Sequence, residues 1–511
     1  MGASVRFITL KLFIFFVCVY LLSTSPINIF DTDASMARYY LTRSIVERFD
    51  LSIPADFGIK GIDGRDYSWY GLGQSVLAIP FYLLGKYLSD PANAVSIMPQ
   101  IFGAAAAVLV FLFCIVLGYS RRTSLYVALL YGLGTFAWPL AKQPFDHTIE
   151  TFFILLSIYF IYLYVTDKKF LHLLFSAFSF GFAFITRQTS MLVIMPLFVL
   201  VIVHYLKRHD FKTTACLITR DLALFSLAFL PFIGLSLWYN YYRFGSIFET
   251  GYQLIAVRTG IDFFSGTPFL TGLSGFLISP GKGFFYYSPV AILFFFGIKS
   301  FFKRHLELAI CFILIALSYL FFLSKNLYWH GDWAWGPRYL LAITPFFIIP
   351  VAEIFESDIW KKNVSLRAFA YFVIAVSFVI QIAAVSVCFQ KYFFYLIHEK
   401  DVKFTVVYGA GVQAIVEPPS ETHFDWHKSP ILTHFKFIYE LASKMKDYKY
   451  SKLPENATDA ENYKANPRMN LIDFWWIHNY YVNGSYSEFF AAFLLLIVSI
   501  YYASTVWKTV T

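Results

Sequence analysis

The sequence predicts an all-α polytopic membrane protein with about twelve transmembrane helices, together with extracytoplasmic surface helices and loops. The first observation is composition, since 58% of the 511 residues are hydrophobic and only 14% are charged. A soluble chain carries roughly 25% charged residues, so much of this surface is expected to face lipid. The second is a series of apolar segments of membrane-spanning length. The third is the 60 phenylalanines and 36 tyrosines, because aromatic rings suit membrane interfaces.

Twelve apolar segments approach the length that crosses a bilayer, some of them only with tilt or local thinning. The apolar stretch 74–88 is assigned to the interface on charge grounds. With 74–88 outside the membrane, the Lys/Arg pairs between spans share one side with the N-terminus and Lys508, and the positive-inside rule makes that side cytoplasmic. The predicted spans are 8–29, 97–119, 124–141, 148–165, 170–186, 189–206, 221–240, 286–302, 306–324, 339–355, 367–389 and 486–507.

This topology leaves three long segments outside, at 30–96, 241–285 and 390–485. In the first of them, Leu41 and Ile45 begin an apolar repeat at helical spacing, which indicates a helix on the membrane surface. The chain is expected to divide into a membrane module, an outer loop or small domain, and a last helix with its tail. Their predicted limits are 1–389, 390–485 and 486–511.

Charge and cysteine usage exclude two other classes. The net charge of +9 is distributed in short clusters beside apolar runs, without a basic arm or a nucleic-acid module, so we predict no nucleic-acid partner. The five cysteines are scattered through apolar segments without paired spacing. We therefore expect packing residues rather than a disulfide framework or a cysteine metal site.

Asp31 and Asp33 form a D-x-D pair where the chain leaves the first predicted span. In soluble nucleotide-sugar transferases such a pair binds a metal on a diphosphate, but no Rossmann-like domain is evident here. A carboxylate at the membrane face instead suits a general base that takes the proton of an attacking acceptor hydroxyl. The alternative is that both aspartates cap the surface helix.

A second acidic site lies in the predicted outer turn between the third and fourth spans. It contains Asp146, His147 and Glu150 at a tight connection that needs no charge. Asp146 and Glu150 would share one helix face at four-residue spacing. The alternative is again a helix N-cap.

Arginines on the predicted outer side are candidate ligands for a phosphate. Arg187 follows an apolar run, where the positive-inside rule does not expect it, and it binds either a substrate phosphate or a lipid headgroup. Arg338 offers a planar fork for phosphate. Lys282, in a glycine-rich outer loop, is a weaker candidate.

The segment 328–339 is the densest in unusual residues. Aromatic rings stack on the apolar faces of sugars, while the sugar hydroxyls require polar partners. An interfacial aromatic belt would explain the tryptophans, but not the polar residues among them. The candidate sugar-pocket residues are Trp329, His330, Asp332 and Trp335.

The order of these features resembles the GT-C superfamily of bacterial membrane glycosyltransferases, near the protein-mannosyltransferase and aminoarabinose-transferase branch. The matching elements are an N-terminal span, acidic residues opening the first outer loop, a surface helix, a Tyr/Gly-rich stretch from Tyr67 to Pro80, and a second acidic site. The resemblance covers residues 8–240 and is loose afterwards, apart from the Trp/Arg turn. It implies the GT-C fold, a polyprenyl-phosphate-sugar donor, inverting transfer, a catalytic aspartate in the first loop and a periplasmic site in a bacterial inner membrane.

We therefore expect transfer of a sugar from a polyprenyl-phosphate donor to a glycan, lipid or protein acceptor. Asp33 or Asp31 is expected to act as base, and Asp146 is expected to orient the acceptor or assist the base. His147, Glu150 and Tyr67 are expected to contribute to the sugar or acceptor pocket. Because arginine stabilises a monophosphate leaving group, the chemistry requires no cofactor, although a divalent metal is compatible with it.

Two other classes of protein remain alternatives. A transporter or flippase for lipid-linked sugars would carry ionisable groups inside its spans, near the bilayer midplane. A sensor or assembly scaffold would have outer loops without convergent acids and arginines. In this sequence the predicted spans are nearly free of acids, and the acids gather on one side.

Overall fold

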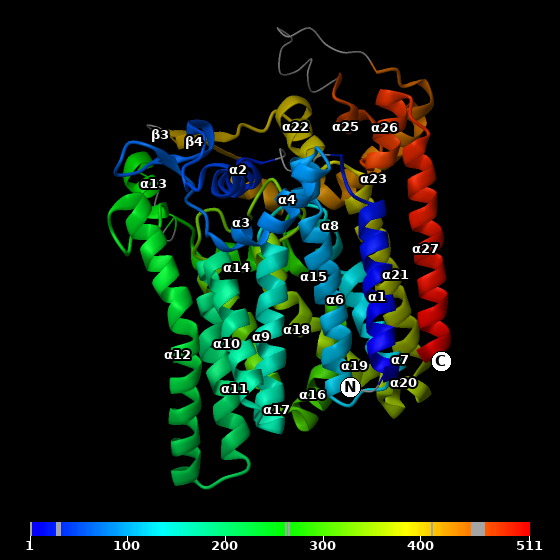
Figure 1. Ribbon diagram of the computed structural model, residues 1–511. Helices are drawn as coiled ribbons and strands as arrows, with labels where there is room; N and C mark the ends of the chain where they lie inside the picture. Colours follow the sequence, from blue (N-terminus) through cyan, green and yellow to red (C-terminus); the bar gives the residue numbers. More distant parts are fainter. Residues whose placement is uncertain are drawn as a thin grey trace.

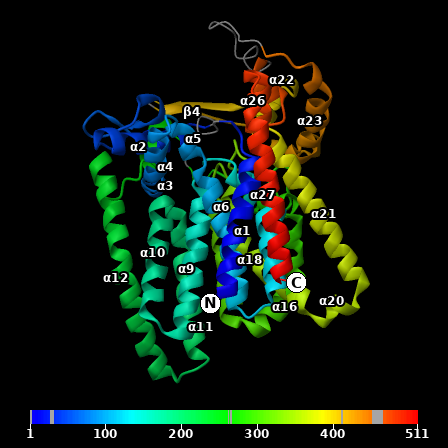
Figure 2. The same cartoon turned by 45° about the vertical axis from the view of Figure 1, so that its right-hand side comes forward.

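The chain folds into a bundle of long helices with shorter elements gathered at one end (Figure 1). The computed structural model describes residues 3–26, 32–260, 263, 266–409, 412–450 and 465–510. α1 begins and α27 ends at the opposite end of the bundle from α2 and α22 (Figures 1 and 2). We call the end with α2 (Asp33–Arg48) and α22 (Phe389–Glu399) the loop face, and the other end the terminal face.

Nine helical stretches of the described residues are long and apolar enough to cross a membrane, so the chain is an integral membrane protein. The remaining three predicted spans are helical but shorter or interrupted, so the all-α polytopic class is confirmed. The long stretches are Val5–Leu22 in α1, Pro91–Val116 in α5 and α6, His147–Asp167 (α9), Gln188–Leu206 in η3 and α11, Phe211–Phe244 (α12), Leu306–Leu323 (α17), Arg338–Glu356 from η5 to α19, Val364–Ser386 (α21) and Ser487–Val510 (α27). The shorter ones are α7 (Arg121–Gly134) with α8 (Ala137–Ala141), α10 (Phe170–Thr186), and η4 (Pro289–Leu293) with α16 (Phe294–Arg304).

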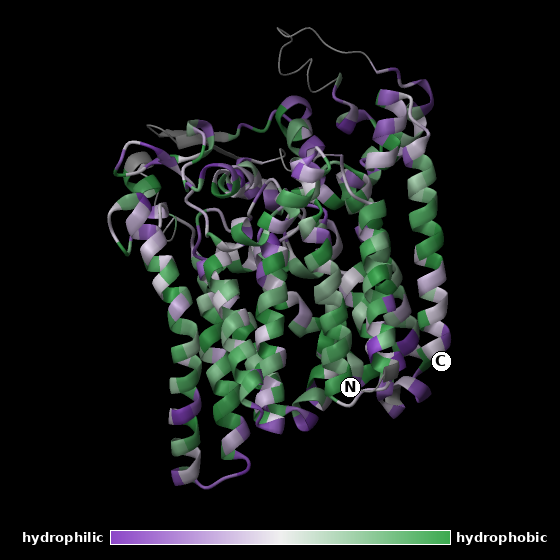
Figure 3. Ribbon diagram, in the orientation of Figure 1, coloured by the Kyte–Doolittle hydropathy of each residue, from purple (hydrophilic) through white to green (hydrophobic). Residues whose placement is uncertain are grey.

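Hydropathy is layered along the bundle. Figure 3 shows apolar residues along the helix shafts and hydrophilic residues mainly at the two ends. The Lys/Arg pairs lie in or beside the connections at the terminal face, as between α9 and α10, and the C-terminus is there too (Figure 1). This grouping agrees with the charge pattern from which the topology was predicted.

The first loop-face segment contains the predicted surface helix, α2. Its N-cap is Thr32, whose side chain accepts a hydrogen bond from the backbone N–H of Ser35. The stretch 74–88 forms two short helices beside α2 rather than a span. These elements are η2 (Ala55–Phe57), the antiparallel pair β1 (Ile59–Lys60) and β2 (Asp66–Tyr67), α3 (Gly73–Leu77) and α4 (Ile79–Tyr87).

The segment after α21 covers the loop face, and its apolar side chains join the main core. Phe389 and Tyr392 of α22 and Phe437 of α23 belong to the same buried cluster as the membrane helices. The predicted division at 389/390 therefore does not separate two cores, and the limits of the domains stay a prediction. The elements are β3 (Thr405–Gly409), antiparallel β4 (Val412–Glu417), η7 (Ser420–Phe424), η8 (Trp426–Lys428), α23 (Pro430–Lys444), η9 (Met445–Asp447), α25 (Pro467–Asn470) and α26 (Trp475–Asn483).

The remaining elements connect the spans. They are α13 (Tyr252–Thr259), α14 (Phe269–Ile278) and α15 (Phe284–Tyr287) on or near the loop face, and α20 (Asp358–Lys362) at the terminal face. The span from Arg338 to Glu356 consists of η5 (Arg338–Ile343), α18 (Thr344–Ile348), η6 (Ile349–Val351) and α19 (Ala352–Glu356). η3 (Gln188–Val193) precedes α11 (Ile194–Leu206), and α5 (Pro91–Ser96) precedes α6 (Met98–Val116).

The topology predicts opposite labelling of two exposed cysteines in intact cells. In Ile62→Cys, the new thiol replaces a side chain that is 67% exposed on the loop face, and a membrane-impermeant maleimide is expected to modify it. The native Cys216 is exposed near the terminal-face end of α12 and should react only after the cells are opened. The unsubstituted chain is the control, and labelling of Cys216 but not of the new thiol would reverse the orientation.

Candidate functional site

The carboxylate of Asp146 lies between two guanidinium groups at the loop-face end of α9. Arg38 Nη2 of α2 is 2.5 Å from Asp146 Oδ2, and Arg187 Nη1, at the end of α10, is 3.1 Å from Oδ1. Burial raises the pKa of Asp146, but the charges of Arg38 and Arg187 outweigh it and hold the pKa below its ordinary value. The side chain occupies the N-cap position of α9 without making a capping hydrogen bond. The site therefore uses Asp146 as a charge partner rather than as a cap.

Glu150 completes this cluster from the same face of α9, as its four-residue spacing from Asp146 predicts. Arg187 Nε lies 3.0 Å from Glu150 Oε2, so Arg187 bridges the two carboxylates. Glu150 Oε1 accepts hydrogen bonds from the hydroxyls of Thr189, Ser190 and Tyr319. Thus both acids predicted in this turn have buried, fixed partners.

Tyr339 joins the Trp/Arg turn to this cluster. Its ring centroid is 5.5 Å from that of His147 and 5.6 Å from the guanidinium carbon of Arg187. The guanidinium of the neighbouring Arg338 lies over the ring of Phe145 at 4.5 Å. Arg338 is half-buried and forms no ion pair with a carboxylate anywhere in the described ranges. Arg338, a cation with no carboxylate partner among the described residues, thus lies beside the Asp146 cluster.

Asp33 is the first residue of α2, the helix that also contains Arg38. Thr32, not Asp33, caps the helix, so capping does not account for this carboxylate. Within the part of the chain that the structure describes, Asp33 has no ion pair or side-chain hydrogen bond, and burial raises its pKa. Tyr70 lies close by: burial raises its pKa, and the charges of Arg38, Arg338 and Asp33 all act on it. Asp31, the other acid of the pair, lies outside the described residues.

A cavity of about 460 Å³ opens beside these groups, between η3, α12 and α17. Its wall has polar and apolar lining residues. The polar ones include Tyr70, Asp146, Arg187, Tyr252, Tyr328 and Tyr339, and the apolar ones include Met191, Leu192, Leu235, Phe322 and Leu323.

A second buried cluster surrounds Asp332 and includes three predicted site residues. Lys282 Nζ is 3.0 Å from Asp332 Oδ1, and His330 Nδ1 is 2.8 Å from Oδ2. His423 of η7 brings its Nε2 to 3.1 Å from the same Oδ2. Lys282 therefore faces a carboxylate instead of the cavity, which differs from its predicted role with phosphate. His423 was not predicted, because no local sequence pattern connects it with Asp332, 91 positions earlier.

The predicted pocket residues Trp329, Trp335 and Tyr67 are not among the residues that line the large cavity. Trp329 and Trp335 are fully buried; Trp329 packs on Phe276, and the ring of Trp335 is 4.9 Å from that of Tyr287. Tyr67 donates a hydrogen bond to Asp63 at 2.7 Å. Four aromatic residues that line the cavity flank the predicted ones in sequence, namely Trp69, Tyr70, Tyr328 and Tyr339. The other aromatic residues in its lining are Phe184, Tyr239, Tyr252, Phe263 and Phe322.

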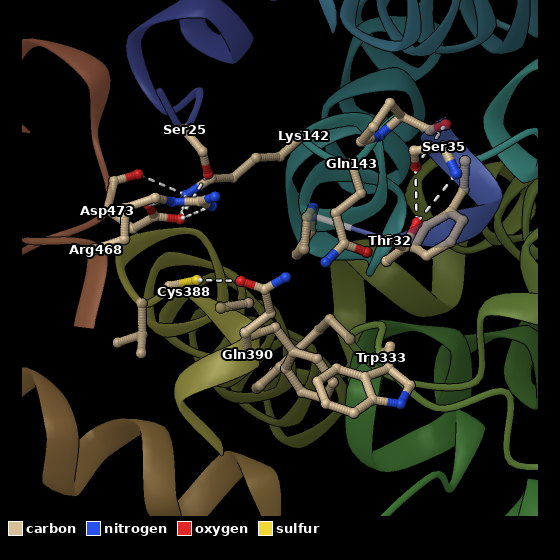
Figure 4. A pocket seen from close by; sticks show the side chains of 17 residues that line it. Ser25, Thr32, Ser35, Lys142, Gln143, Trp333, Cys388, Gln390, Arg468 and Asp473 are labelled. Carbon is tan, nitrogen blue, oxygen red and sulfur yellow. Dashed lines mark hydrogen bonds and ion pairs between the residues drawn. The ribbon is translucent and has the colours of Figure 1, made fainter. Parts of the chain in front are cut away.

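A third buried carboxylate, Asp473, holds the C-terminal segment against the first span, beside a smaller cavity of about 30 Å³ (Figure 4). Lys142 Nζ is 3.0 Å from Asp473 Oδ2, and Arg468 Nε is 3.1 Å from Oδ1. Ser25 donates a further hydrogen bond of 2.6 Å. Burial raises the pKa of Asp473, but Arg468 and Lys142 lower it to about 2. Sequence patterns gave no signal for this contact between residues more than 300 positions apart.

Residues 77–234 match the family described as dolichyl-phosphate-mannose-protein mannosyltransferase. This match confirms, over those residues, the resemblance to GT-C membrane glycosyltransferases. No curated protein matches the chain.

Solved structures with similar folds include ArnT from Cupriavidus metallidurans bound to undecaprenyl phosphate, at 14% identity and TM-score 0.46, covering 87% of this chain and 80% of that one. The oligosaccharyltransferase of Archaeoglobus fulgidus, tethered with an acceptor peptide, gives 13% identity and TM-score 0.46, covering 74% of this chain and 53% of that one. This chain thus spans about half the length of the archaeal enzyme.

The ion cluster predicts a large stability difference between two aspartates. Asp146→Asn leaves buried Arg38 without its carboxylate partner and half-buried Arg187 with Glu150 alone, and removal of one member of a buried ion pair typically costs about 3–5 kcal/mol. Asp56→Asn, at an exposed position of the first loop, is the matched control and should leave unfolding unchanged. Thermal unfolding of the purified chain in detergent measures both, and equal unfolding temperatures would contradict the buried pairing.

Proposed function

We propose that this chain, a GT-C-type membrane glycosyltransferase, moves a sugar from a polyprenyl-phosphate donor to an acceptor hydroxyl or amide at the loop face. The donor phosphate binds at Arg338 beside the Asp146 cluster, and Asp33 is the general base. The loop face is extracytoplasmic, in a bacterial inner membrane. The acceptor is a glycan, a lipid or a protein.

The observation that carries this proposal is the pairing of charges beside the cavity. Three guanidinium groups, of Arg38, Arg187 and Arg338, act on this region, and the two carboxylates of the buried cluster, Asp146 and Glu150, pair with Arg38 and Arg187 but not with Arg338. A guanidinium that neither carboxylate pairs with favours an anionic ligand, and the planar fork of Arg338 suits a phosphate. Because Arg187 is fixed by both carboxylates, its predicted role changes from direct phosphate ligand to a fixed positive charge at the cavity wall.

The shape of the cavity supports an amphiphilic donor. Its wall combines polar residues such as Asp146 and Arg187 with Leu235 of α12 and Phe322 and Leu323 of α17, which lie within candidate membrane spans. A phosphate beside the polar residues with an isoprenoid chain along the apolar ones would match each part of the ligand to a wall of like polarity. The family match over 77–234 supports the same class of donor.

The two candidate acids differ in the way that general-base catalysis requires. Asp146 is held ionised between two arginines, which lower its pKa and occupy both oxygens, so it is a poor proton acceptor. Asp33 has no such partners among the described residues, and burial raises its pKa toward the working range of a base. Asp146 therefore positions Arg38 and Arg187, and Asp33 takes the proton.

The reaction is a single displacement with inversion. The acceptor's nucleophilic atom forms a bond to the anomeric carbon while the bond from that carbon to the donor phosphate oxygen breaks. The acceptor proton passes to Asp33, and the sugar departs from a polyprenyl phosphate whose charge Arg338 stabilises. Asp33 returns the proton to water when the products leave.

The positions of Glu150, Glu307 and Asp221 along the candidate spans support a transferase. The alternative is a transporter or flippase of lipid-linked sugars. A transporter would place ionisable groups near the midplane of the bilayer. Here Glu150 and Glu307 each stand in the first turn of their helices. Asp221 accepts hydrogen bonds from Tyr164 and Tyr205 next to Lys168, which is at the terminal face.

Asp33→Asn is expected to lower the transfer rate about 10²- to 10⁴-fold, because asparagine keeps the shape but cannot accept a proton. The assay is transfer from a synthetic polyprenyl-phosphate sugar by the purified chain, with thermal unfolding measured in parallel. In the unsubstituted chain, the rate should fall as pH drops through a pKa that lies above the ordinary value for an aspartate.

The same transfer assay is applied to two further variants, Asp56→Asn as the control and Asp31→Asn as the test of the other acid of the pair. Asp56→Asn should transfer normally. Loss of transfer in Asp31→Asn with normal transfer in Asp33→Asn would move the base to Asp31. Normal transfer in both would remove the base from the first loop and contradict the proposed chemistry.

Substitutions of Arg338 test the phosphate site separately from the base. Arg338→Ala should weaken binding of a short-chain polyprenyl phosphate roughly 10- to 100-fold, since charge-assisted hydrogen bonds contribute about 1.5–3 kcal/mol. Arg338→Lys should bind with intermediate affinity, because it keeps the charge and loses the fork. Arg367→Ala, at a half-buried position near the terminal face, is the control, measured by the same titration calorimetry. Unchanged affinity in Arg338→Ala would exclude this residue from the donor site.

A further inference from the structure

Three buried ligand-type side chains converge outside the proposed transfer site. His330, Asp332 and His423 each offer one ligand atom, and these atoms all lie within 4.8 Å of one another. The exposed fractions of the three residues are 3%, 1% and 1%. We call these three residues the His–Asp–His cluster.

The local backbone brings the first two ligands together. His330 and Asp332 flank Gly331, whose φ of 53° lies in the left-handed region that favours glycine. The turn points both side chains to one place, with His330 Nδ1 2.8 Å from Asp332 Oδ2. η7 supplies the third, since His423 Nε2 is 3.1 Å from the same oxygen. The backbone N–H of Gly281 also donates to the carbonyl of His423, which fixes this residue from a second side.

The donor set belongs to a particular class of metal. Two imidazole nitrogens and one carboxylate oxygen are a common protein ligand set for zinc and related divalent transition metals, whereas magnesium and calcium prefer oxygen ligands. Zinc bonds of about 2.0–2.2 Å in tetrahedral geometry separate the ligand atoms by roughly 3.3–3.5 Å. The separations of 2.8 and 3.1 Å around Asp332 Oδ2 are therefore near those of a bound ion.

Lys282 is in the position of an outer partner. Its Nζ is 3.0 Å from Asp332 Oδ1, the oxygen turned away from both histidines. Carboxylate ligands of metals are commonly held in this way by a second group on the other oxygen. The arrangement leaves Oδ2 to the two imidazoles.

We propose that the His–Asp–His cluster binds one divalent transition metal of the zinc class and that this ion fastens η7 to the turn before Arg338. The ligands come from two segments 90 residues apart, so a bound ion links the C-terminal loop-face segment to the wall of the proposed donor site. The ion is a structural staple and takes no part in the transfer reaction. Its presence is independent of the proposed function, because it is measured without substrate.

The first experiment uses the unsubstituted full chain, purified in detergent and treated with a chelator. Zinc chloride is titrated by calorimetry, and the metal content after dialysis is measured by plasma mass spectrometry. We expect one zinc per chain and a higher unfolding temperature with zinc than with magnesium. No binding beyond that of a chelator-treated control membrane protein, or equal effects of zinc and magnesium, would overturn the proposal.

The second experiment locates the ion. His423→Ala should weaken zinc binding more than about 100-fold, beyond the 10- to 100-fold that loss of an outer partner costs. His434→Ala is the matched control, because His434 is also a fully buried loop-face histidine and packs on Trp335 outside the cluster. Its zinc affinity should be unchanged. Equal affinities in the two variants would place any bound zinc elsewhere and overturn the proposal. If His423→Ala fails to fold, Asp332→Asn takes its place in the same comparison.

Discussion

The carboxylate of Asp146 is bound on both oxygens, by Arg38 at 2.5 Å and by Arg187 at 3.1 Å, and these two contacts join α2, α9 and the end of α10. Removing three charges from water is costly, and only close mutual pairing offsets that cost. The pairing therefore fixes where the first turn of α2 lies, and with it Asp33. It also fixes the face of Arg187 that lines the cavity. Glu150 takes the remaining side of that guanidinium, and neither of these two carboxylates pairs with Arg338.

The loop face as a whole is held by buried carboxylates that each bind cations or imidazoles from distant segments. Asp473 ties the C-terminal segment to Lys142 and to the end of α1 through Ser25, and Asp332 ties η7 to Lys282. Among the lipid-facing helices, association relies on packing, since lipid tails are as apolar as the side chains. Ion pairs and hydrogen bonds require a particular direction between their partners, whereas apolar contacts do not. The side chains with precisely fixed positions are therefore found mainly at the loop face, where the spans end.

The environment separates two aspartates that look alike in sequence. Asp146 is surrounded by positive charge and is locked as an anion, which makes it suited to holding arginines in place. Asp33 is partly buried without a described partner, which makes its carboxylate available to a substrate proton. The same contrast appears between Arg187, which is compensated, and Arg338, which is not. Chemical role thus follows from the partners that packing supplies, not from residue type.

The sequence by itself determined the membrane class, the positions of all twelve helical segments and the gathering of the unusual polar groups on one side. It also placed Asp146 and Glu150 on one helix face. These are local properties, because hydropathy and the helical repeat are set by neighbours within a few residues. It did not identify Arg38 as the partner of Asp146, His423 as the neighbour of Asp332, or Trp329, Trp335 and Tyr67 as core residues apart from the cavity. Only the tertiary structure decided these, because the partner of a buried charge depends on how segments far apart in the chain pack against each other.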